Sequence, residues 1–280
     1  MGGSNPKTHT APTLFVSRNS MTDRYKLSQF YQGKETETQY SSFQTVDEEI
    51  FEVENLQIVS LAMDFPQGTS QKVRQEIEKK WIDTLPNLKK VKQLSVRHRV
   101  KQDFFEAICE MRSLESLTFW TSTVEDISSI SKLSKLAFLK LWSFSRLKDI
   151  APLLQLRKLK VLSIDNCFKV ENYEIISQMT QLVGLELCGD TFAPRNLRIN
   201  SLKPFETLKS LKHLDLSSAS VVDKSYDSIL KMKNLERFDL VVNVPKEMRD
   251  KIKTEHQSLK AGFFVDYDFE NKKFYDGKQW

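Results

Sequence analysis

Leu136-Ala137-Phe138-Leu139-Lys140-Leu141 carries apolar residues at its first, fourth and sixth positions, and the chain repeats this phrase along most of its length. Nine phrases of this form begin at Leu56, Val91, Leu114, Leu136, Leu159, Leu182, Leu211, Leu235 and Leu259. Six of the eight gaps between them are 22 to 24 residues, and the other two, of 35 and 29 residues, indicate insertions. A fixed period of this length predicts a solenoid, in which each repeat packs on the next.

The second and third apolar positions of each phrase are two residues apart, which is the periodicity of a β-strand. The segments between phrases favour helices, because apolar residues recur there on one stripe. We expect these helices over residues 68–81, 103–111, 173–179, 226–232 and 247–256. One strand and one helical connection per repeat predict an α/β fold with a single parallel sheet, whose helices lie on one side.

The repeated phrase resembles the leucine-rich repeat, L-x-x-L-x-L-x-x-N/C-x-L, over roughly residues 54–266. The unit from Val124 to Leu136 is similar to the short bacterial and SDS22-like subtype, and Leu147 to Leu153 is similar to internalin-type repeats. The resemblance implies a curved parallel sheet on the concave face, helices and irregular turns on the convex face, and a cap at each end. It also implies a surface for binding a protein partner.

One position departs from the pattern of that family. The Asn/Cys position is filled, in chain order, by Arg99, Ser122, Phe144, Cys167, Asp190, Ala219 and Asn243. Only Cys167 and Asn243 match the pattern, so we expect turns that are less uniform than in a consensus array. Cys167 itself is expected to be a buried structural thiol.

The repeat pattern divides the chain into four expected parts. We expect a flexible leader over 1–25, an N-terminal cap of short strands over 26–53, a solenoid of about nine repeats over 54–266, and a C-terminal cap over 267–280. The solenoid includes a helical insertion at 68–85, which accounts for the first long gap.

Composition limits the class of protein. The 42 basic and 37 acidic residues give a net charge of +5, which does not by itself indicate a nucleic-acid partner. The three cysteines, Cys109, Cys167 and Cys188, lack metal-ligand spacing, and their odd number favours a reducing compartment. We find no signal-peptide pattern and no apolar run of the ~20 residues that span a bilayer. These features predict a soluble, cytoplasmic protein, although an exported effector has the same features. The resemblance to short bacterial repeats implies a bacterial protein.

The register of the phrases predicts which side chains leave the open face of the sheet. Counting the first apolar residue as zero, offsets 2, 4 and 6 point away from the core. An aromatic-basic group is expected there, made of Arg97, Trp120, Phe138, Lys140 and Trp142, with His98 and Arg99 at its margin. An acidic run follows on the later repeats, made of Asp165, Glu186, Asp215 and Asp239.

Two interpretations of each group stay open. Exposed tryptophan beside arginine is typical of a binding hot spot, but the two tryptophans could instead stack on each other or be covered by the N-terminal segment. The acidic run could select a basic partner or could be a solvated face. All nine residues of the two groups are our candidates for partner binding.

The sequence predicts no catalytic, cofactor-binding or metal-binding residues, and no cofactor. The pair Cys188 and His213 would lie ~13 Å apart along neighbouring strands, which is too far for a catalytic dyad. We therefore expect a non-enzymatic, monomeric module that binds a protein on its concave face, with neither a nucleic acid nor a membrane as partner. The resemblance to bacterial short-repeat proteins implies, as our first interpretation, an intracellular inhibitor such as an immunity protein. The alternatives are a translocated effector acting on a host protein, a self-assembling scaffold, and an enzyme whose chemistry lies in residues 1–53.

Overall fold

The computed structural model describes residues 39–42, 46, 48–59, 65, 67–190, 195–240, 244–268, 271 and 273–274. The predicted leader at 1–25 lies outside these residues. So does Asn243, one of the two residues that match the Asn/Cys position.

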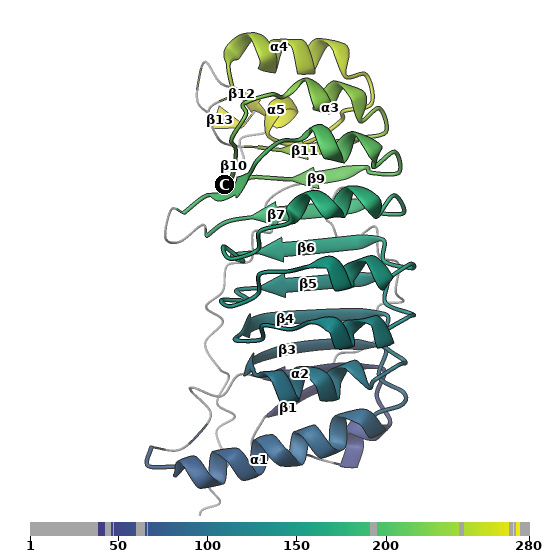
Figure 1. The fold of residues 1–280 in the computed structure, drawn as a ribbon, viewed down its shortest axis with the longest axis vertical. Coiled ribbons are helices and arrows are strands. Elements are labelled where there is room, and N and C mark those ends of the chain that lie inside the picture. Colours follow the sequence, from purple (N-terminus) through teal and green to yellow (C-terminus); the bar gives the residue numbers. More distant parts are fainter. Residues whose placement is uncertain are drawn as a thin grey trace, which may run out of the picture.

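A parallel sheet of nine strands forms the body of the molecule, and its strands stack in chain order along the long axis (Figure 1). Its strands are β1 (Gln39–Ser42), β2 (Asn55–Val59), β3 (Gln93–Val100), β4 (Ser116–Ser122), β5 (Phe138–Trp142), β6 (Val161–Asp165), β7 (Gly184–Cys188), β9 (His213–Asp215) and β11 (Arg237–Asp239). The parallel sheet with one strand per repeat that the phrase spacing predicts is therefore confirmed as the main sheet.

Eight of the nine phrases have the register that the sequence predicts, the last of them through the single bridge between Arg237 and Ala261. Offset 2 is in line across the sheet, where Phe138 of β5 lies between Ser116 of β4 and Val161 of β6. The first phrase is different, because Leu56 pairs with Leu94, the residue at offset 3 of the second phrase. The prediction that the first phrase begins at Leu56 was wrong. It begins three residues earlier, at Val53. The chain contains two overlapping apolar triplets here, one starting at Val53 and one starting at Leu56, and the sequence alone does not distinguish them.

The helical connections all lie over one face of the sheet (Figure 1). Four of them are α-helices: α1 (Gln71–Thr84), α2 (Gln102–Cys109), α3 (Asp227–Lys231) and α4 (Lys246–Glu255). The others are 3-10 turns: Leu85–Asn87, Ser128–Lys132, Ala151–Gln155, Tyr173–Gln178 and Lys203–Thr207, with a further turn at Glu48–Phe51 before β2. The helices expected over 68–81, 103–111 and 247–256 are confirmed, whereas the segment at 173–179 forms a 3-10 turn.

Repeat length explains why most connections are 3-10 turns. A period of 22 to 24 residues leaves few residues between one strand and the next, and the tighter 3-10 turn closes in fewer residues than an α-helix. Each closing residue donates its N–H to the carbonyl three residues earlier, as Leu133 does to Ile130, and Leu136 then donates to Leu133 in the same way. These closing residues are buried, so each turn also delivers an apolar side chain to the core.

The core is one continuous apolar cluster that runs along the whole solenoid, from Ile50 before β2 to Phe264 after β11. The buried leucines of each phrase supply its repeating part, because offsets 3 and 5 point toward the helices. No helix among the described residues is both long enough and apolar enough to cross a membrane.

The 29-residue gap contains a second, smaller sheet. Strands β8 (Leu197–Ile199) and β10 (Ala219–Val221) pair in parallel beside the ends of β7 and β9. Gly189 permits this arrangement, because a Cβ atom there would lie 2.2 Å from the carbonyl oxygen of Arg195. The prediction that this gap is an insertion is confirmed.

The last phrase does not form a full strand. Ala261 makes a single parallel bridge to Arg237, and the chain then turns into α5 (Phe263–Asp266), followed by the short antiparallel pair β12 (Tyr267–Asp268) and β13 (Lys273–Phe274). Gly262 makes the turn with φ of 105°, and a Cβ atom there would lie 2.1 Å from the carbonyl oxygen of Phe238. Only glycine fits this backbone position.

The turn after each strand varies with the residue in the Asn/Cys position. Cys167 is fully buried, accepts the N–H of Phe144 at 3.4 Å and donates to the carbonyl of Asp165 at 3.3 Å. Its burial raises the pKa of the thiol to about 12. Ser122 bonds in a similar way, donating its hydroxyl to the carbonyl of Val100 at 3.0 Å. The buried structural role predicted for Cys167 is confirmed.

Replacing Gly262 by alanine is expected to displace the C-terminal turn from β11, because the added methyl group cannot coexist with the Phe238 carbonyl. We expect the free energy of unfolding to fall by roughly 2–4 kcal/mol in urea titrations. Gly68 also has a positive φ of 89° but has open space around it, so Gly68→Ala is the matched control. Equal losses in the two variants would contradict the steric argument.

Cys167→Ala is expected to lower the free energy of unfolding by about 2 kcal/mol, since it leaves the buried Phe144 N–H without its acceptor. Cys109 is an equally buried thiol in α2, where the helix bonds do not depend on the sulfur. Cys109→Ala therefore serves as the control, and thermal and urea unfolding of both variants measure the difference. If the two variants lost the same free energy of unfolding, the hydrogen bond at Cys167 would contribute no stability beyond the packing of its side chain.

Candidate functional site

The candidate site is the open face, by which we mean the face of the nine-stranded sheet opposite the helical connections. Side chains at offsets 2, 4 and 6 of successive repeats form ladders across this face, because neighbouring strands are ~4.8 Å apart. The structure divides the face into the two groups that the sequence predicts, which we call the aromatic-basic half and the acidic half.

In the aromatic-basic half, Trp120 and Trp142 contact each other from neighbouring strands. Their ring centroids are 4.6 Å apart and the rings are tilted by 44°. The Arg97 guanidinium lies over the Trp120 ring at 4.8 Å, and the Lys140 ammonium lies 5.8 Å from the Trp142 ring centroid. The indole N–H of Trp120 donates to the Ser95 hydroxyl at 3.2 Å. Cation-π contacts of this kind hold the rings in one orientation.

The mutual stacking of the two tryptophans does not remove them from solvent. Both rings are half-buried and Arg97 is exposed, as is expected for a preformed aromatic surface. Phe138 and Lys140 on β5 are half-buried as well. The five residues predicted for this half therefore lie together on the open face.

A bulge in β3 shifts the margin of this half. Between the pairs Val96–Phe119 and Arg99–Thr121, β3 contains one residue more than β4. The prediction that Arg99 occupies the Asn/Cys position was therefore wrong, because Val100 pairs with Ser122 and takes that position. The extra residue also turns His98 toward Glu78 of α1, at 3.9 Å, so His98 is not a margin residue of the open face.

The acidic half has the predicted register but not the predicted exposure. Asp165, Glu186 and Asp239 are at most 9% exposed, and only Asp215 is half-buried. The interpretation of this run as a solvated acidic face was wrong, since most of its carboxylates do not reach solvent.

Cations of the same chain lie against these carboxylates. Arg237 Nε is 2.5 Å from Asp239 Oδ2, and the Phe263 N–H donates to the other oxygen of Asp239 at 2.9 Å. Lys140 Nζ is 3.7 Å from Glu186 Oε1, which connects the two halves of the face. Sequence reasoning missed the partnership of Arg237 with Asp239. The signal was present, because residues two apart on a strand share a face.

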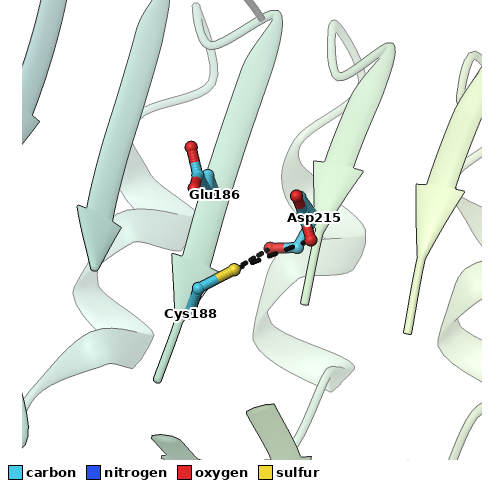
Figure 2. A group of neighbouring side chains, drawn as sticks. All are labelled: Glu186, Cys188 and Asp215. Atoms are coloured by element: carbon cyan, nitrogen blue, oxygen red, sulfur yellow. Dashed lines mark hydrogen bonds between the residues drawn. The ribbon is translucent and has the colours of Figure 1, made fainter. Parts of the chain in front are cut away.

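Figure 2 shows Glu186 and Cys188 on β7 beside Asp215 on β9, with the Cys188 thiol directed toward Asp215. The Cys188 thiol donates to Asp215 Oδ1 at 3.6 Å. The donor atoms of these three residues lie within 4.8 Å of one another, as do those of His213, Asp215 and Asp239. Oxygen, nitrogen and sulfur donors could hold a metal ion in principle. Arg237 and Lys140, however, already place positive charge against these carboxylates, so we assign no metal to them.

Burial and mutual repulsion change the protonation of this half. Burial, together with the neighbouring charge of Asp215, raises the pKa of Asp239 to about 7 against the opposing effect of Arg237. Burial also raises the pKa of the Cys188 thiol well above its usual value, with Asp215 and Glu186 acting in the same direction. A buried protonated thiol is a poor nucleophile.

Comparison with solved structures agrees with this geometry. An internalin from Listeria monocytogenes matches with a TM-score of 0.53 and 15% identity, over 76% of this chain and 54% of its own. A leucine-rich repeat protein from Leptospira interrogans matches with a TM-score of 0.54 and 21% identity, over 78% of this chain and 51% of its own.

The fold is a leucine-rich repeat solenoid. The resemblance predicted from the repeated phrase is therefore confirmed at the level of the fold. This leucine-rich repeat chain spans about half the length of each of these two structures. No family model and no curated protein matches the sequence.

Asp215→Asn tests the electrostatics of the acidic half. The pKa of Asp239 is higher in the folded state than in the unfolded state, so the contribution of Asp239 to stability falls as pH rises from about 4 to about 7. Removing the Asp215 charge lowers the pKa of Asp239, so the variant should be more stable than wild type at pH 8 by ~1 kcal/mol, with a smaller difference at pH 5. Urea unfolding at the two pH values measures this.

Asp83→Asn, at an exposed site on α1, is the control and should leave the free energy of unfolding unchanged at both pH values. A loss of stability in Asp215→Asn that is equal at both pH values would contradict the charge argument. It would show instead that the hydrogen bond from the Ser217 N–H to Asp215, at 2.8 Å, dominates.

Proposed function

We propose that this protein is a non-enzymatic binding module that holds a protein partner on the aromatic-basic half of the open face. The observation that carries the proposal is the Trp120–Trp142 pair, which is half-exposed and held between Arg97 and Lys140. Tryptophan and arginine are the residue types most enriched at binding hot spots. Aromatic rings held in place before binding lose little conformational entropy when a partner covers them.

The state of the cysteines supports a binding role over a catalytic one. Cys109, Cys167 and Cys188 are free and buried, and burial raises the pKa of all three thiols. A catalytic cysteine needs a lowered pKa and access to substrate, and none of the three has either. Free thiols are also compatible with the reducing, cytoplasmic location that we propose.

We propose further that the protein acts by covering its partner, as an intracellular inhibitor or an immunity protein does. A rigid row of strands offers a continuous surface, and a partner held along it has its own facing surface blocked. The most informative observation on this point is the gene next to the one encoding this chain, because a toxin gene there would favour immunity.

The double variant Trp120→Ala/Trp142→Ala tests the site. With the tagged full chain as bait, the dominant partner should be recovered by wild type and lost by the double variant. Titration of the purified partner should then show a fall in affinity of about 100-fold or more, since hot-spot truncation costs on the order of 2–4 kcal/mol.

Phe51→Ala removes an exposed aromatic ring elsewhere on the molecule and serves as the matched control. It should bind as wild type does, and circular dichroism should show all three proteins folded. Equal affinity of wild type and the double variant would overturn the assignment of the site.

A further inference from the structure

We propose that a pocket beside β8 binds a short peptide with free termini, whose ammonium group lies at Glu171 and Glu174 and whose carboxylate lies at Arg198. The pocket has a volume of about 340 Å³, which is at the small end of the range for ligand sites in proteins. None of its lining residues belongs to the open face, so this inference does not rest on the proposed function.

Two consecutive repeats form the walls of this pocket. One wall is the turn after β6 with the start of the next 3-10 turn, and the other is β8 with the 3-10 turn that follows it. The apolar lining residues are Val170, Tyr173, Ile199, Pro204 and Phe205, and the polar ones are Glu171, Glu174, Arg198, Asn200 and Ser201. All the apolar residues except Pro204 are buried, whereas all the polar ones except Ser201 are exposed. An apolar floor with a few polar groups at its rim is typical of a ligand site.

The pocket lies where a hydrogen bond between repeats is missing. Lys148, Glu171 and Asn200 occupy equivalent positions, two residues before the buried residue at the start of the following 3-10 turn. The Glu171 N–H donates to the Lys148 carbonyl at 3.0 Å, and the Asn200 carbonyl accepts the Asp223 N–H at 3.1 Å. Among the described residues, the corresponding bond from the Asn200 N–H to the Glu171 carbonyl is absent. The pocket therefore occupies a gap between two repeats that are otherwise in register.

The strand that lines the pocket has one edge without a partner strand, since β8 pairs only with β10 in the part of the chain that the structure describes. The Leu197 N–H donates to the Ser218 carbonyl at 3.0 Å, and the Ile199 carbonyl accepts the Val222 N–H at 2.8 Å. Because backbone groups alternate between the two edges of a strand, the N–H and C=O of Arg198 face the other edge. An extended peptide can pair with these two groups as a third strand.

Opposite charges on the two walls select the two ends of the peptide. Glu171 and Glu174 lie on one wall and Arg198 lies on the other. Although the three line one pocket, none of them makes an ion pair with a described residue. A peptide with free termini offers an ammonium group to the glutamates and a carboxylate to Arg198. The planar guanidinium suits a carboxylate, because it can donate two parallel hydrogen bonds to it.

An NMR titration of the isotope-labelled full chain with the tripeptide Ala-Leu-Ala tests the proposal. Every tripeptide presents the same backbone and termini, so the test does not depend on the sequence of the probe. The free tripeptide should bind, and the form with an acetylated amino end and an amidated carboxyl end should bind at least about tenfold more weakly, because it loses the charge-assisted hydrogen bonds. The absence of binding at millimolar concentrations of the free tripeptide would overturn the proposal. Equal affinity for the two forms would overturn it in favour of an internal segment of a longer chain.

Two variants assign each charge to one end of the peptide. Arg198→Gln should weaken binding of the free tripeptide about tenfold and leave the affinity for the carboxyl-amidated form unchanged. Glu171→Gln/Glu174→Gln should likewise weaken binding of the free tripeptide and leave the affinity for the amino-acetylated form unchanged. Lys169→Gln removes an exposed charge that does not line the pocket, and this control should bind as wild type does. If Arg198→Gln weakened binding of the free and amidated forms equally, the contact between Arg198 and the carboxylate would be refuted.

The same titration locates the bound peptide. The amide signals of Arg198 and Asn200 should shift as the tripeptide is added, whereas the indole signals of Trp120 and Trp142 should not. Shifts of the indole signals without shifts at Arg198 would place the peptide on the open face and overturn the proposal. Loss of partner binding in the tryptophan double variant is a separate result, so failure of this proposal and failure of the proposed function are distinguishable.

Discussion

In-register parallel pairing of one short strand per repeat is the constraint on which the rest of this structure depends. A parallel strand five residues long has little stability alone, but each rung shares its hydrogen bonds and its apolar layer with two neighbours. The same alignment that stacks the leucines on the inner side stacks the residues at offsets 2, 4 and 6 on the outer side. Binding surface and core are therefore two consequences of one register.

The departures from this constraint are local, and each has a physical cause. The extra residue in β3 is absorbed as a bulge, which turns His98 toward α1 and brings Val100 into the Asn/Cys position. The insertion after β7 forms its own small sheet rather than interrupting the large one. At the C-terminal end Gly262 turns the chain after the Ala261 bridge, so that α5 forms in place of a further strand.

The two halves of the open face show that register and environment are separate properties. Trp120 and Asp165 occupy the same offset, two repeats apart, yet one is half-exposed and the other buried. Arg237 and Lys140 of the same chain compensate part of the negative charge of the acidic half. A buried, internally paired group of carboxylates contributes less to attracting a basic partner than a solvated one, because its field is already compensated. The aromatic-basic half is the better candidate for recognition.

The sequence by itself determined the solenoid, its long parallel sheet, the register of eight of the nine phrases and the membership of both halves of the open face. It could do so because the spacing of the leucines gives both the two-residue period of a strand and the length of the repeat. Only the tertiary structure decided where the first phrase begins, that β3 bulges, that Trp120 and Trp142 stack between two cations, and that Asp165, Glu186 and Asp239 are buried. These properties depend on contacts between side chains of different repeats, and no pattern within a single repeat encodes them.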